Sequence, residues 1–189
     1  MPLVIFEGPE AAGKTTLIEA LQNHWGSNIQ FRGWGPRESW LEYCQPLFDD
    51  IKACREDPKL LVIWSRSWLS RAVYNNLLDQ GRPVPRAVIT ELDNIVVREK
   101  GLLLLVSSPE TVLLNRRLER LSQPNSKPDH PLNPGKELQE FYTQNRSRKW
   151  RMISGVKPTE DTVREIISLI VERNPECRMA LKLEEPIGV

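Results

Sequence analysis

The chain has 189 residues, of which 40% are hydrophobic and 27% are charged, and its formal net charge at pH 7 is +1. This length suits one domain with a full core, and the composition is that of a soluble globular protein. A net charge so close to zero excludes a global electrostatic attraction to nucleic acid or to a membrane surface, and leaves only a local basic patch for such a role.

The cysteines and the apolar runs indicate the cellular compartment in which we expect the protein. Cys44, Cys54 and Cys177 are odd in number and form no C-x-x-C pair, so we expect reduced, buried thiols. The N-terminus has no basic segment followed by a long apolar one, and no apolar run approaches the length that spans a membrane. We therefore expect a cytoplasmic protein without a signal peptide or a membrane partner.

The most specific motif lies in residues 3–16, where a short apolar run is followed by Gly8-x-x-x-x-Gly13-Lys14-Thr15 and then by a helical pattern. This order is typical of a phosphate-binding loop. The glycines let backbone N–H groups point at an anion, Lys14 supplies a cation for the β- and γ-phosphates, and the Thr15 hydroxyl can ligate a bridging magnesium ion. We therefore expect ATP and Mg²⁺ as cofactors. The residues expected to bind them are Gly8, Pro9, Glu10, Ala11, Ala12, Gly13, Lys14, Thr15 and Thr16.

Strands and helices alternate along the chain. Apolar runs predict strands over residues 2–6, 28–31, 60–64, 102–106 and 150–153. Periodic apolar positions predict helices that end near Trp25 or run over about 36–56, 68–78, 85–100, 109–121, 138–149 and 159–173. The alternation implies an α/β fold with a parallel five-stranded sheet and helices on both faces.

Single residues predict how several of these helices begin and end. Gly26 and Gly101 are expected to close the helices that precede them. Ser108-Pro109 is expected to cap the helix that follows. Pro46 lies inside the helix predicted over 36–56, where a proline kinks the backbone.

The helix after Pro109 combines leucines with arginines and precedes residues 122–136, which are rich in Pro, Asn, Ser and Lys and predict a mobile loop. Its apolar residues are expected to face the core: Leu114, Leu118 and Leu121. Its basic residues lie elsewhere on the helix: Arg116, Arg117 and Arg120. Arginines beside a mobile loop could neutralise charge on a transferring phosphoryl group, although a lone arginine on a helix is more often solvated.

Ser65-Arg66-Ser67 follows the third strand, at the edge where open α/β sheets bind their ligands. The Arg66 guanidinium suits phosphate oxygens, so it can grip the acceptor or the transferring group. The alternative is a salt bridge at a strand end.

These motifs resemble those of the thymidylate-kinase-like nucleoside and nucleotide kinases. Residues 6–16 are similar to that family's phosphate loop, and residues 65–74, Ser-Arg-Ser-Trp-Leu-Ser-Arg-Ala-Val-Tyr, resemble its second motif. The three arginines before a polar segment resemble its lid. The resemblance covers residues 1–172 loosely, as in divergent bacteriophage kinases. It implies a P-loop kinase fold over 1–173, a lid over about 116–149, and a C-terminal tail over 174–189.

The resemblance also implies roles for single residues. The family places an acid at the position of Glu10, close to the acceptor, and Glu10 therefore joins the expected catalytic residues. These are Lys14, Arg66, Glu10, Arg116 and Arg120. The expected acceptor-binding residues are Trp34, Arg37, Trp40, Arg66, Ser70 and Tyr74. A tryptophan could stack on a base, but Trp40 lies on an apolar stripe and could belong to the core, as could Tyr74. The family's acid before the arginine is Ser65 here, and Glu7 and Glu10 are the nearby carboxylates that could replace it.

Three functions remain open at this point. The first is ATP-dependent phosphoryl transfer to a deoxynucleoside monophosphate, in nucleotide metabolism. The second is transfer to a hydroxyl, either of a deoxynucleoside or of 5-hydroxymethyl-deoxyuridine within DNA, as in viral thymidine hypermodification; Glu10 or Glu38 would then act as base. The third is a non-catalytic nucleotide-binding protein. The expected partners are a nucleotide or nucleoside, DNA under the second hypothesis, and a second copy of the chain in a homodimer; if the protein is viral, it works in the host cytoplasm.

Overall fold

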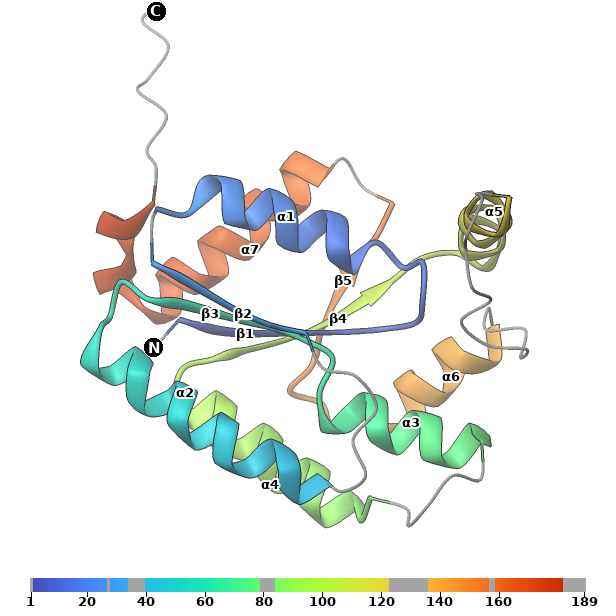
Figure 1. The fold of residues 1–189 in the computed structure, drawn as a ribbon, viewed down its shortest axis with the longest axis horizontal. Coiled ribbons are helices and arrows are strands. Elements are labelled where there is room, and N and C mark those ends of the chain that lie inside the picture. Colours follow the sequence, from blue (N-terminus) through green and yellow to red (C-terminus); the bar gives the residue numbers. More distant parts are fainter. Residues whose placement is uncertain are drawn as a thin grey trace, which may run out of the picture.

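The computed structural model describes residues 2–26, 28–33, 40–78, 84–122, 136–156 and 159–181. Its strands form one parallel sheet in the order β2-β3-β1-β4-β5 (Figure 1). The strands are β1 (Leu3–Glu7), β2 (Ile29–Gly33), β3 (Leu61–Ser65), β4 (Leu102–Ser107) and β5 (Arg151–Ser154). The predicted α/β fold with five parallel strands is confirmed, and each strand lies within one or two residues of its predicted range.

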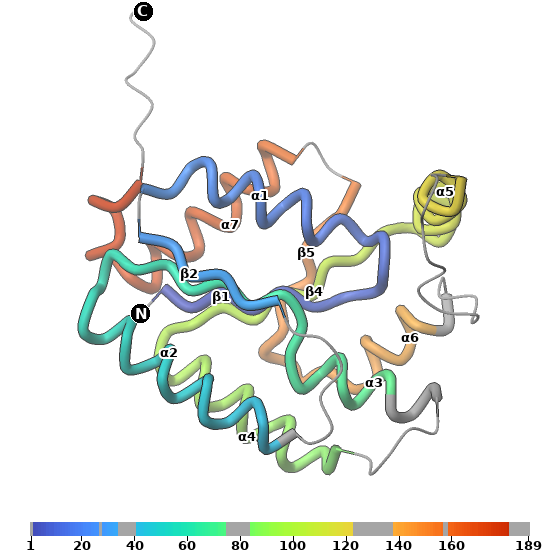
Figure 2. Tube along the Cα trace, in the orientation of Figure 1, coloured from blue at the N-terminus to red at the C-terminus, as the bar shows by residue number. Residues whose placement is uncertain are grey.

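Helices cover both faces of the sheet, as predicted (Figure 2). One face carries α1 (Lys14–His24) and α7 (Thr159–Arg173). The other carries α2 (Cys44–Glu56), α3 (Trp68–Leu78), α4 (Arg86–Arg98) and α6 (Lys136–Asn145). Helix α5 (Glu110–Leu121) and two short 3-10 helices, η1 (Trp40–Tyr43) and η2 (Pro175–Ala180), complete the described elements. The central strands are fully buried between the two apolar layers, because β1, β3 and β4 are apolar along nearly their whole length.

The structure corrects the predicted helix ends. Trp25, in extended conformation, ends α1. Gly26 has no positive φ, and its N–H donates to the Ala180 carbonyl oxygen at 2.7 Å. A Cβ on Gly26 would lie 2.8 Å from that oxygen, so close packing of η2 accounts for the glycine. After α4, the residue with left-handed backbone is Lys100 (φ 62°), not Gly101.

Two further local predictions concern prolines. Pro46, predicted to lie inside a helix over 36–56, is instead the third residue of α2 and lies in its first turn, directly after η1, where a proline is tolerated. The predicted Ser108-Pro109 side-chain cap is wrong. The N-cap of α5 (Glu110–Leu121) is Pro109, without a side-chain cap. The Ser108 hydroxyl instead donates to the Ala12 carbonyl oxygen at 3.1 Å, which ties the end of β4 to the phosphate loop.

The predicted inward face of α5 is also wrong. Leu114, Leu118 and Leu121 are 46%, 55% and 44% exposed, whereas Leu113 is buried. The reason is the place of α5, which stands beyond the end of β4 and does not lie flat on the sheet (Figure 1). Leu113 is the leucine of this helix that belongs to the buried core.

Part of the predicted tail packs on the domain. Cys177 is buried in η2, and its thiol donates to the Pro58 carbonyl oxygen at 3.1 Å. The Asn174 side chain donates to the Lys100 carbonyl oxygen at 3.2 Å. No described helix combines the length and apolar character that crossing a membrane requires.

Candidate active site

The loop between β1 and α1 has the backbone of an anion cradle. Gly8 and Gly13 have φ angles of 135° and 99°, and Ala11 has a φ of 60°. A Cβ on Gly8 would lie 2.2 Å from the Val106 carbonyl oxygen, so only glycine fits beside β4. Helix α1 begins at Lys14, and its first N–H groups and dipole end at the loop. The loop can therefore receive a phosphate group on main-chain N–H groups.

Lys14 is buried at this cradle. Its Nζ donates to the carbonyl oxygens of Gly8 at 2.7 Å and Pro9 at 2.8 Å. Burial, and then the nearby Arg66, lower its pKa to about 7, and the carboxylate of Glu7 opposes that shift. The two carbonyl oxygens are neutral acceptors, whereas a polyphosphate would give this ammonium an anionic acceptor and therefore a stronger hydrogen bond.

Thr15 is exposed in the first turn of α1, where its hydroxyl is open to a cation. Among the described residues, no group of three histidine, cysteine or acidic side chains could hold a metal ion. The site therefore fits magnesium of the kind that is bound through one hydroxyl and the phosphate oxygens of the nucleotide, and such an ion would offset charge on the phosphates.

Arg66 lies at the end of β3, beside the loop. Its φ is 75°, which is rare outside glycine, and its N–H donates to the Phe6 carbonyl oxygen at 2.8 Å. Its Nη1 donates to the Tyr74 hydroxyl at 3.0 Å, and the guanidinium lies 5.3 Å from the centre of the Tyr74 ring. Arg66 and Tyr74, each predicted to bind the acceptor, are thus in direct contact.

Glu7 is the buried acid of the site, at the end of β1. Its carboxylate accepts hydrogen bonds from the Ser67 hydroxyl at 2.7 Å and from the Ser70 N–H at 3.0 Å, and a third from the Ser70 hydroxyl. The Ser70 hydroxyl also contacts the Tyr142 hydroxyl of α6 at 2.8 Å. Burial raises the pKa of Glu7 above its usual value, against the lowering effect of these hydrogen bonds.

Sequence reasoning named Glu7 only as a possible replacement for a missing acid, placed Ser70 among the acceptor residues, and missed Ser67 and Tyr142. The Ser70 hydroxyl is engaged with Glu7 and is almost fully buried. A carboxylate that ends an otherwise apolar, buried strand was the available signal, because an unpartnered charge is not stable there. Glu10 is half-buried in the loop and is close enough to raise the pKa of Lys14.

The two predicted catalytic arginines of α5 differ in position. Arg116 donates from Nη1 to the Ala11 carbonyl oxygen at 3.1 Å and from Nη2 to the Gly155 carbonyl oxygen at 3.0 Å. It therefore braces the phosphate loop against the segment after β5. Arg120 is exposed, and its charge adds to those that lower the pKa of Lys14.

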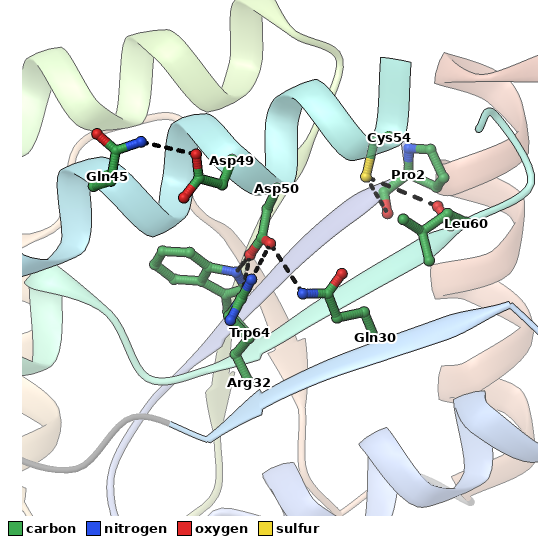
Figure 3. Close-up of polar contacts among 9 residues, drawn as sticks. All are labelled: Pro2, Gln30, Arg32, Gln45, Asp49, Asp50, Cys54, Leu60 and Trp64. Atoms are coloured by element: carbon green, nitrogen blue, oxygen red, sulfur yellow. Dashed lines mark hydrogen bonds and ion pairs between the residues drawn. The ribbon is translucent and has the colours of Figure 1, made fainter. Parts of the chain in front are cut away.

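Several predicted site residues after β2 lie outside the described residues: Trp34 and Arg37, predicted to bind the acceptor, and Glu38, a candidate base. Trp40 begins η1, and its side chain lies outside the described part as well. The described end of β2 shows a different polar centre, which the sequence analysis missed (Figure 3).

That centre surrounds Asp50 of α2, which is 1% exposed. Arg32 donates to both of its carboxylate oxygens at 2.6 Å, and Trp64 donates from Nε1 at 2.7 Å (Figure 3). Gln30 donates to it at 3.2 Å. Because its carboxylate is bonded on both oxygens by strand residues, Asp50 serves to fasten α2 to β2 and β3.

Comparisons with known proteins agree with this geometry. The sequence matches no family model, and no curated protein matches it. Solved structures do match, among them the YorR protein of Bacillus subtilis in complex with phosphorylated GDP, at 18% identity and a TM-score of 0.63 over 90% of this chain and 96% of that one. The chain has the P-loop kinase fold.

Two further structures extend the comparison. Polyphosphate kinase 2 from Arthrobacter aurescens is similar at 9% identity and a TM-score of 0.56, over 99% of this chain and 71% of that one. Thymidylate kinase from Candida albicans is similar at 14% identity and a TM-score of 0.50, over 94% and 93%. At these identities the likeness establishes the fold, and the substrates have to be argued from the site.

Proposed function

We propose that this protein transfers the γ-phosphoryl group of ATP to a nucleotide or nucleoside acceptor, with magnesium. The observation that supports this best is the meeting of two cations near the Glu7 carboxylate: Lys14, the first residue of α1, whose Nζ bonds back to the Gly8 carbonyl oxygen, and Arg66, which directly follows β3. Phosphoryl transfer is catalysed mainly by positioning and by charge stabilisation, and this arrangement supplies both.

The first acceptor that we propose is a deoxynucleoside monophosphate. Lys14 and the loop N–H groups would hold the donor, Thr15 the metal ion, and Arg66 the acceptor phosphate. Arg116 and Arg120 would add positive charge near the transferring group. A phosphate acceptor is already ionised and needs no general base, so Glu7 would only offset the two cations in this version.

The second acceptor is a hydroxyl group, which has to lose its proton. The carboxylate that we propose as its base is Glu10, which is half-buried in the phosphate loop and near Lys14. In this version the acceptor oxygen bonds to the γ-phosphorus, its proton passes to Glu10, and the bond from phosphorus to the bridging oxygen breaks, which leaves ADP with the electron pair. The hydroxyl would belong to a deoxynucleoside or to 5-hydroxymethyl-deoxyuridine in DNA.

The test is a panel of acceptors incubated with γ-labelled ATP and magnesium: deoxynucleoside monophosphates, deoxynucleosides, and DNA with and without hydroxymethylated pyrimidine. Polyphosphate should be included as an alternative donor, since one similar structure is a polyphosphate kinase 2. Label on free monophosphates alone supports the first acceptor, and label on a nucleoside or on modified DNA supports the second. Tight ATP binding without transfer to any acceptor would favour a non-catalytic nucleotide-binding protein.

A further inference from the structure

A chain of hydroxyl groups leads from α6 to the buried acid of the site. The Tyr142 side chain is fully buried between α6 and α3 and reaches Ser70, which in turn bonds to Glu7. The three residues come from α6, α3 and β1, and 72 positions separate Ser70 from Tyr142. Neither Tyr142 nor Ser70 is needed to form the phosphate loop, so their burial together with a carboxylate calls for its own explanation.

The hydrogen bonds of this chain have a fixed direction when Glu7 is ionised. A serine hydroxyl has one proton, and Ser70 donates it to Glu7. Tyr142 must therefore donate to Ser70. Each donor polarises the next, so the tyrosine strengthens the bond that the carboxylate receives.

The other groups around Glu7 are charged or can titrate. Arg66 lowers the pKa of Glu7 by its charge, and Glu7 raises the pKa of Lys14. Tyr142 has a pKa well above its usual value, first because it is buried and then because Glu7 is near. The carboxylate thus has two cations and a neutral chain of hydroxyl groups among its neighbours.

We propose that Tyr142 and Ser70 are positioning residues that hold the Glu7 carboxylate in place near Lys14 and Arg66, so that the docking of α6 on α3 sets the position of both cations in the catalytic centre. This inference rests on the proposed kinase function. Because Tyr142 is fully buried and bonds to Ser70, it would act through Ser70 and not by contact with a ligand.

The test is a double-mutant cycle with Tyr142→Phe and Ser70→Ala, assayed for kcat, for KM of the acceptor and for the Kd of MgATP. Tyr142→Phe removes one oxygen and no carbon, so it keeps the packing of α6. We expect kcat to fall about tenfold, the loss expected for a single hydrogen bond in a polar network, with the Kd of MgATP unchanged. In the Ser70→Ala background, Tyr142→Phe should have no further effect, because its path to Glu7 is already broken.

The matched control is Thr143→Val, which removes the neighbouring exposed hydroxyl of α6, bonded only to the Gln139 carbonyl oxygen at 2.9 Å among the described contacts. It should leave kcat at the wild-type value. The proposal is overturned if Tyr142→Phe keeps wild-type kcat, or if the two substitutions act additively, which would mean that each only loosens the packing. If Tyr142→Phe does not fold, a wild-type kcat for Ser70→Ala overturns it as well. An inactive wild-type protein would contradict the proposed kinase function itself, and the two failures are therefore distinct.

Discussion

The glycine at position 155 gives the sharpest test of how the phosphate loop is shaped. Gly155 follows β5 and packs against the loop, and a Cβ built on it would lie 1.9 Å from the Ala12 carbonyl oxygen and 2.5 Å from the Ser108 Oγ. Its φ is not in the left-handed region. Gly155→Ala therefore adds a collision with the loop without adding backbone strain.

The size of the effect follows from those distances. Ordinary contact begins at 3.4 Å, so the Ala12 carbonyl has to retreat by about 1.5 Å in a close-packed site. Overpacking of this kind costs about 1–3 kcal/mol of stability. Because Ala12 belongs to the cradle, a displacement of roughly 1 Å should weaken MgATP binding at least tenfold and catalysis up to about a hundredfold.

The assay is calorimetric titration with MgATP, together with thermal unfolding. Gly33→Ala is the matched control, since among the described residues a Cβ there would meet the ring of the exposed Phe31, at 3.4 Å, which is ordinary contact. The control should bind MgATP as the wild type does. If Gly155→Ala binds MgATP within twofold of the wild type, the loop is not held in place by this contact and the reasoning fails.

Three further substitutions or measurements probe the same site. Lys14→Met should lower the rate of phosphoryl transfer about a hundredfold or more. The melting temperature should stay the same or rise, because the substitution removes a buried ammonium group. A lower melting temperature would contradict this prediction. Arg116→Ala should weaken MgATP binding about fivefold, since the hydrogen bonds that join the loop at Ala11 to Gly155 are lost. The exposed Arg120→Ala should leave MgATP binding unchanged, and equal effects of the two substitutions in the titration would contradict the role of Arg116 in holding the loop. Burial raises the pKa of Cys54 to about 12, so a thiol reagent at pH 8.5 should label the half-buried Cys44 first, as mass spectrometry can check; prompt labelling of Cys54 would argue against its burial.

The sheet and the loop could be predicted from the sequence because their signals are local. Leu61 to Trp64 form a continuous apolar run, which is what a strand buried on both faces requires. The glycines and Lys14 of the loop lie within eight residues of one another, and their spacing alone specifies the turn. Both predictions are confirmed in the fold.

The helix faces and the polar contacts of the site depend on tertiary placement, which the sequence does not show. The apolar stripe of Leu114 and Leu118 predicts a buried face, but α5 stands at the end of the sheet and has little to pack against. Arg116 lies 105 positions from Ala11, whose carbonyl it binds. The partners of Glu7 are 60 or more positions away. Pairing over such separations follows only once the strand order is known.

The measurement that bears most directly on the central claim is the transfer of label from γ-labelled ATP to the acceptor panel, with wild-type protein and Lys14→Met side by side. The account predicts magnesium-dependent label on a nucleotide, a nucleoside or hydroxymethylated DNA with the wild type, and none with the variant. Equal transfer by the two proteins, or none from the wild type while MgATP binds, would contradict it.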